Sequence, residues 1–174
     1  MVRASISAKI GALAAIVCSV PLGGGCGGRG GKSQAEGERI PPYPSSLAAQ
    51  SSPSQVAQVL IQALDDGNEA VLQGLVAVKH EMEAIDAIYK KHGKEHKATP
   101  SAAVAMTVSG WKMSYAWYQP GATHVRSERI SGETAMVEAE GLNPTTRRPR
   151  ELAVTMVRED GVWKAAAGLR ARDL

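Results

Sequence analysis

Phenylalanine is absent from this 174-residue sequence, and aromatic residues make up only 4% of it. A folded core must therefore be built from Ala, Val, Leu, Ile and Met together with three Trp. Cysteine is scarce too, because Cys18 and Cys26 are the only two and both lie near the N-terminus, which leaves no disulfide framework. A large charge excess is also missing: the formal charge is +3, and it falls by two if Arg3 and Lys9 are removed with a leader. This balance disfavours nucleic acid as a partner.

Residues 1–25 have the layout of an export signal. A basic start, with Arg3 and Lys9, precedes an apolar stretch at 10–22 that is short for a membrane span and suited to a signal peptide. A Gly-Gly-Gly-Cys sequence follows at 23–26. It resembles the lipobox of bacterial lipoproteins, although Gly23 stands where that motif usually has Leu. The resemblance implies that Cys26 is acylated and holds the chain on a membrane of the bacterial cell envelope, outside the cytoplasm.

Two other interpretations of this N-terminus stay open: an ordinary cleaved secretory signal with Cys26 as a free thiol, and a cytosolic chain with an apolar start.

Residues 26–52 are rich in Gly, Pro and Ser and cannot bury enough apolar area to fold, so we predict a disordered, lipidated tether. Gly-Gly-Lys-Ser at 30–33 ends like a phosphate-binding loop, but Cys26 stands where that motif needs Gly. We expect no cofactor.

Residues 53–121 have the apolar spacing of helices. Ser52, Pro53 and Gln55 predict a helix start with a capping box, and Gly67 predicts its left-handed end. Residues 69–92 predict one long helix, or two helices with a bend near residue 79. Thr99 and Pro100 open a further helix, which Gln-Pro-Gly at 119–121 ends.

Residues 122–172 contain four strand-like runs with alternating apolar side chains. The turn signals between them are Ser-Gly at 131–132, Asn-Pro at 143–144 and Asp-Gly at 160–161, the last being typical of a type I′ hairpin. Short loops make consecutive strands antiparallel neighbours. The fold class is therefore α+β, with N-terminal helices packed on a four-stranded antiparallel meander.

Two short segments carry a family resemblance: Leu-Asp-Asp-Gly-Asn-Glu-Ala-Val at 64–71 and Arg-Glu-Asp-Gly-Val-Trp-Lys at 158–164. With the order of elements, they resemble the NTF2-like superfamily. The resemblance implies a cone in which helices close over a concave sheet and leave a pocket. The predicted organisation is a signal peptide at 1–25, a lipidated tether at 26–52 and an NTF2-like domain at 53–174.

The candidate pocket residues are Trp111, Tyr115, Tyr118 and Trp163. The first three share one face of the last predicted helix. Such an aromatic stripe usually packs in the core, and the functional alternative is that it lines a cleft between helix and sheet. The fold alone does not determine function. Because the sequence has a lipobox-like start, a linker and no catalytic constellation, we expect a non-catalytic domain that binds a small apolar ligand or a protein partner. A homodimer is a further alternative.

The alternative function is an isomerase-like or dehydratase-like enzyme that uses a pocket acid or base with Tyr115 or Tyr118. The other candidate groups are His80, Asp86, His124 and Glu128. Their spacing gives no nucleophile–base pair, so we predict no catalytic residue.

Two clusters of basic residues are typical of solvent-exposed segments. His92 and His96 have the spacing of metal ligands, but Gly93 separates them and lysines surround them, which favours a solvated helix end and no metal. The Arg-Arg-Pro-Arg sequence at 147–150 favours a solvated hairpin tip, and contact with anionic lipid headgroups is the other interpretation.

Overall fold

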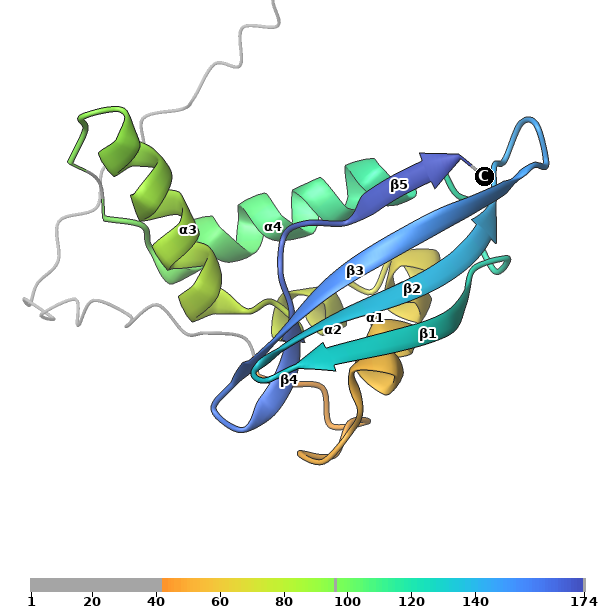
Figure 1. The fold of residues 1–174 in the computed structure, drawn as a ribbon, viewed down its shortest axis with the longest axis horizontal. Coiled ribbons are helices and arrows are strands. Elements are labelled where there is room, and N and C mark those ends of the chain that lie inside the picture. The colour runs from red at the N-terminus through yellow and green to blue at the C-terminus, as the bar shows by residue number, and fades with distance from the viewer. Residues whose placement is uncertain (1–41, 96, 174) are drawn as a thin grey trace, which may run out of the picture. The chain divides into compact units, whose positions relative to one another are not determined.

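The computed structural model describes residues 42–95 and 97–173. The signal peptide, Cys26 and most of the predicted tether lie outside the described residues. Four helices precede five strands (Figure 1). They are α1 (Pro53–Asp66), α2 (Glu69–Gly74), α3 (Val78–Lys91), α4 (Pro100–Tyr115), β1 (His124–Ser131), β2 (Thr134–Leu142), β3 (Pro149–Glu159), β4 (Val162–Ala165) and β5 (Arg170–Asp173). The α+β class, with helices before an antiparallel sheet, is confirmed.

The helix ends follow from local sequence. Ser52 Oγ accepts a hydrogen bond from Gln55 N at 3.3 Å, and Gln55 Oε1 accepts one from Ser52 N at 2.8 Å, which completes the predicted capping box. Gly67 ends α1 with a φ of 64°, a left-handed conformation that glycine adopts without steric cost. Thr99 caps α4 by accepting from Ala102 N at 3.3 Å.

The helix is interrupted between α2 and α3, so the alternative of two helices is correct. Residues 75–77 lie beside β4, where Ala77 N donates to Ala165 O at 2.9 Å and Ala165 N donates to Leu75 O at 2.8 Å. Pairing with a strand far along the chain therefore interrupts an otherwise helical stretch.

The sheet has the order β1-β2-β3-β4, and β5 pairs with β3 beyond the end of β4. Asp160 and Gly161, with φ values of 52° and 83°, form the predicted tight turn between β3 and β4. The fourth predicted run is divided into two strands, because the backbone groups between them are bonded elsewhere. Ala166 O accepts from Trp111 Nε1 at 3.0 Å, and Ala167 N donates to Glu81 Oε1 at 2.8 Å.

The hydrophobic core lies between the helices and one face of the sheet, with α1 behind the strands in Figure 1. Its largest fully buried side chains include Leu60 and Ile61 of α1, Trp111 of α4, Val137 of β2, and Leu152, Val154 and Met156 of β3. Residues 42–52, predicted as the end of the tether, also contact this unit: Pro44 is buried, and Tyr43 Oη donates to Trp163 O at 3.0 Å. The compact unit therefore begins before α1.

Candidate functional site

The structure buries all four candidate pocket residues. Trp111 and Tyr115 lie on the inner face of α4, Tyr118 lies just beyond its end, and Trp163 lies on β4. None of the four is more than 8% exposed. Trp111 fills the centre of the core, and its ring nitrogen is bonded to Ala166 O. The aromatic stripe is thus part of the packing, and only part of it reaches a surface groove.

Tyr115 and Tyr118 form a stacked pair with ring centroids 5.4 Å apart and ring planes 14° from parallel. The Tyr115 hydroxyl donates to Asp65 Oδ1 of α1 at 2.8 Å, and the Tyr118 hydroxyl donates to Glu151 O of β3 at 2.5 Å. Burial, reinforced by the Asp65 carboxylate, raises the pKa of Tyr115 well above its ordinary value. Tyr115 therefore stays neutral at physiological pH and anchors two elements to one another.

A surface groove of about 380 Å³ runs along this tyrosine pair. The turn between α1 and α2, the C-terminal end of α4 and the loop between β2 and β3 form its walls. Its lining residues are Leu64, Gly67, Lys112, Tyr115, Ala116, Tyr118, Pro120 and Pro144. The only charged side chain among them is Lys112, which is paired with Glu69. The groove is therefore a mostly apolar surface with aromatic rings at its base.

Trp111 and Trp163 do not line this groove. The Trp163 ring has the Arg158 guanidinium 6.0 Å from its centroid, and its carbonyl accepts from Tyr43. The structure therefore brings two of the four predicted pocket residues to one groove and places the two tryptophans in the packing beside it.

The candidate acids and bases lie away from this groove, on α3 and β1. Asp86 Oδ1 accepts from Ala98 N at 2.7 Å and Glu128 Oε2 accepts from Ser54 N at 2.8 Å, so both carboxylates hold backbone groups. His80 and His124 are exposed. None of the four is among the residues that line the groove.

Three carboxylates with structural roles were not predicted from the sequence. Glu81 and Glu159 are buried, and they accept from Ala167 N and His80 N respectively, each at 2.8 Å. Asp65 holds Tyr115. Asp65 is the penultimate residue of α1, and nothing in its neighbouring sequence indicates that it bonds to α4.

Within residues 42–95 and 97–173, no three His, Cys, Asp or Glu side chains are close enough to hold a metal ion. His96, one of the two histidines with ligand-like spacing, lies outside the described residues. No helix in the described part of the chain is long and apolar enough to cross a membrane.

No known protein family matches the sequence, and neither does any curated protein. Among solved structures, the chain is similar to one described as an NTF2-like transpeptidase from Campylobacter jejuni. The two are 11% identical, the match covers 67% of this chain and 98% of the other, and the TM-score is 0.40. A likeness at this level carries no information about activity.

Proposed function

We propose that this chain is a lipid-anchored, non-catalytic binding protein of the bacterial cell envelope, built on an NTF2-like scaffold. Its groove beside Tyr115 and Tyr118 receives a small apolar ligand. The observation that supports this function is the apolar lining of that groove over a stacked tyrosine pair whose hydroxyl groups are already bonded to protein atoms.

The chemistry of the lining favours an apolar ligand. Both tyrosine hydroxyls are engaged with Asp65 and Glu151, so the rings offer carbon surface. Lys112 is held by Glu69 and is not a dedicated anion site. Ligand pockets commonly have volumes of about 300–1,000 Å³, and a groove of about 380 Å³ is at the small end of that range.

The placement of acids and bases supports a non-catalytic role. A general base must come within hydrogen-bonding reach of the proton that it removes. Asp86 and Glu128 hold backbone groups elsewhere, and the raised pKa of Tyr115 makes it a poor proton donor or acceptor at neutral pH.

Ala116→Glu tests the groove, because it places a carboxylate on the lining at an exposed position. With the apolar dye Nile red as probe, we expect affinity to fall at least about tenfold, since a bound dye would remove water from the new carboxylate, which is costly against apolar surface. The matched control is Ala105→Glu, which changes an exposed alanine of α4 outside the lining. Equal dye binding by the two variants would refute the groove as the site.

Cys26→Ser tests the anchor. Loss of the acylated cysteine should move the chain from the membrane fraction to the soluble fraction, because acyl chains supply the apolar area that holds such proteins on a bilayer. Unchanged fractionation in high salt, which screens electrostatic contacts with the bilayer, would contradict lipid attachment at this residue.

A further inference from the structure

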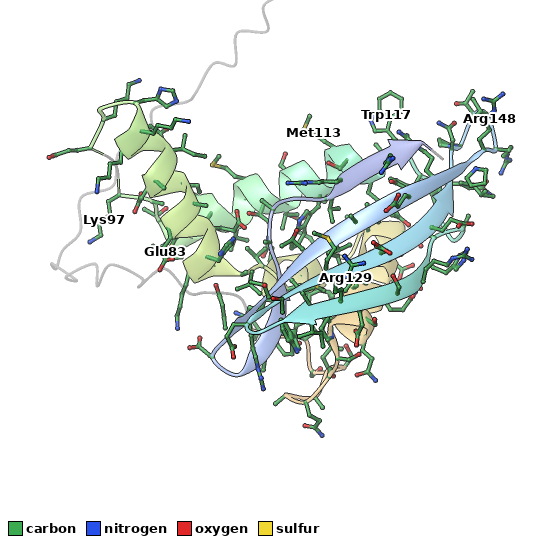
Figure 2. The ribbon with its side chains drawn as sticks, in the orientation of Figure 1. Glu83, Lys97, Met113, Trp117, Arg129 and Arg148 are labelled. Atoms are coloured by element: carbon green, nitrogen blue, oxygen red, sulfur yellow. The ribbon has the colours of Figure 1, made fainter. Side chains whose placement is uncertain are left out.

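The outward face of α4 is apolar and is exposed within the part of the chain that the structure describes. Met106, Met113 and Trp117 are 62%, 72% and 62% exposed, and their spacing puts them along one side of the helix and its continuation. Figure 2 shows Met113 and Trp117 projecting to the same side of the molecule, away from the strands. A solvated helix normally carries charged side chains on its outer face, and a contiguous apolar face marks an interaction surface.

Basic residues predominate in the segments that carry this face and the hairpin tip beside it. From residue 98 to residue 127, a range that includes all of α4, the sequence has no Asp or Glu. The loop and strand start at 143–150 contain Arg147, Arg148 and Arg150 and no acid. Of the acids near this face, Glu69 pairs with Lys112 and Asp65 holds Tyr115, while Asp173 of β5 lies opposite Arg150 in the sheet.

The arginine-rich hairpin tip is fixed beside Trp117. Arg150 Nη1 donates to Trp117 O at 3.3 Å, Gln119 N donates to Leu142 O at 2.7 Å, and Arg147 donates to the Gln119 side chain. Arg148 is exposed at the tip, at the same end of the molecule as Trp117 in Figure 2. The apolar and the cationic parts therefore lie next to each other, and together we call them the α4 surface: Met106, Met113, Trp117, Arg147 and Arg148.

We propose that the α4 surface docks on an anionic lipid bilayer. Trp117 lies at the level of the headgroups, where amphipathic rings are favoured, and the two methionines contact the acyl boundary. Arg147 and Arg148 face lipid phosphates, whose field attracts basic side chains within about 10 Å. This docking goes beyond the proposed ligand site. It uses the proposed anchor only to bring the surface near the membrane.

A second copy of the chain fits this face less well. If two α4 helices paired in parallel, the arginine tips would meet each other. If they paired antiparallel, each tip would meet the loop before the other α4, which carries Lys94, Glu95 and Lys97 and is therefore positive overall. Either arrangement opposes like charges, which disfavours association, whereas an anionic bilayer complements the whole surface.

Trp117 reports docking directly, because the other two tryptophans, Trp111 and Trp163, are buried. The full-length chain is bound to phosphatidylcholine vesicles with brominated acyl chains, with or without phosphatidylglycerol. We expect lipid quenching and a blue shift of Trp117 emission only when phosphatidylglycerol is present, with reversal by high salt. Trp117→Leu should remove the quenched component, which assigns the signal.

Two matched pairs of exposed positions test the two parts of the surface. Arg148→Gln should weaken docking about fivefold, whereas Arg129→Gln on β1 should leave it unchanged. Met113→Gln should weaken docking, and Ile130→Gln, at another exposed apolar residue, should not. Circular dichroism checks that all four variants are folded.

Quenching that ignores phosphatidylglycerol, or equal effects of Arg148→Gln and Arg129→Gln, would overturn the proposal. So would a dimer in vesicle-free solution in which Trp117 is shielded from iodide, because a second copy would then cover the face. Failure of the anchor is separable: Cys26→Ser that leaves fractionation unchanged in high salt, which releases the α4 surface from the bilayer, would refute lipid attachment, while the Trp117 signal at low salt would still report docking.

Discussion

Gly141 marks the tightest packing near the tyrosine pair. A Cβ added at Gly141 would lie 2.5 Å from Thr123 Oγ1 and 2.9 Å from Tyr118 Cδ1, closer than carbon atoms approach in folded proteins. We expect Gly141→Ala to destabilise the protein by about 1–3 kcal/mol, because a buried ring and a buried hydroxyl must move. The free energy of urea unfolding measures the change.

Gly110 is the matched control for this substitution. It lies on α4, and an added Cβ would meet nothing within 4 Å. Gly110→Ala should raise stability by up to about 1 kcal/mol, since alanine restricts the unfolded chain and suits a helix. A stabilising Gly141→Ala, or equal effects at both glycines, would contradict the packing described around Tyr118.

The residues that sequence reasoning missed have distant partners. Glu81 and Glu159 are buried carboxylates, yet neighbouring sequence gives no sign of it, because Ala167 N and His80 N reach them only after the sheet has formed. Trp117 was also missed. It follows a helical stripe of buried aromatic residues, and its 62% exposure depends on where α4 ends.

At the scale of elements, capping and turn residues in the sequence predicted the features that depend on hydrogen bonds between nearby residues. The capping box at Ser52, the left-handed Gly67 and the Asp160-Gly161 turn all appear as the sequence predicts, because each depends on atoms within a few residues. The break at residues 75–77 and the division between β4 and β5 could not be fixed in this way, because both depend on pairing across the fold.

The bond between Tyr115 and Asp65 joins α4 to α1, and it predicts a loss of stability at alkaline pH. An unfolded tyrosine loses its proton near its ordinary pKa of 10.0, whereas burial raises the pKa of Tyr115 in the folded state. The folded state therefore holds more protons above pH 10.0, so this contribution to stability is complete below that pH and decreases as pH rises beyond it.

Tyr115→Phe isolates this effect. The variant should lose about 1 kcal/mol at neutral pH, where the hydroxyl donates to Asp65. It should also show a shallower fall of unfolding free energy above pH 10.0 than the wild-type protein. Parallel pH profiles for the two proteins, measured by urea unfolding, would show that Tyr115 does not titrate differently on folding.

For the molecule as a whole, the alternation of apolar residues in the strands and their helical spacing in the helices predicted a layer of helices on a sheet. Each element has one apolar face to bury, which leaves few ways to pack them. They also predicted that Trp111, Tyr115 and Tyr118 share a face. The groove itself could not be predicted, because its walls come from segments distant in sequence: Gly67, Pro120 and Pro144 meet only in the folded protein.

Stability should be uneven across the molecule, with the outer half of α3 the weakest helix. Only Val78 and Glu81 of α3 are buried, both in its first turn, and Figure 1 shows the helix standing at one end, away from the strands. We expect the amides of residues 84–91 to exchange hydrogen by local opening, at free energies well below those of the buried half of α1. Native-state hydrogen exchange measures both.

Substitutions separate local from global stability in the same experiment. Ile88 is 60% exposed on α3, so Ile88→Gln should change the global unfolding free energy by no more than about 0.5 kcal/mol. Leu60 of α1 is fully buried, so Leu60→Ala should cost about 2–5 kcal/mol and speed exchange throughout the sheet. If Ile88→Gln destabilised the whole unit as strongly, the outer half of α3 would have to be part of the cooperative core.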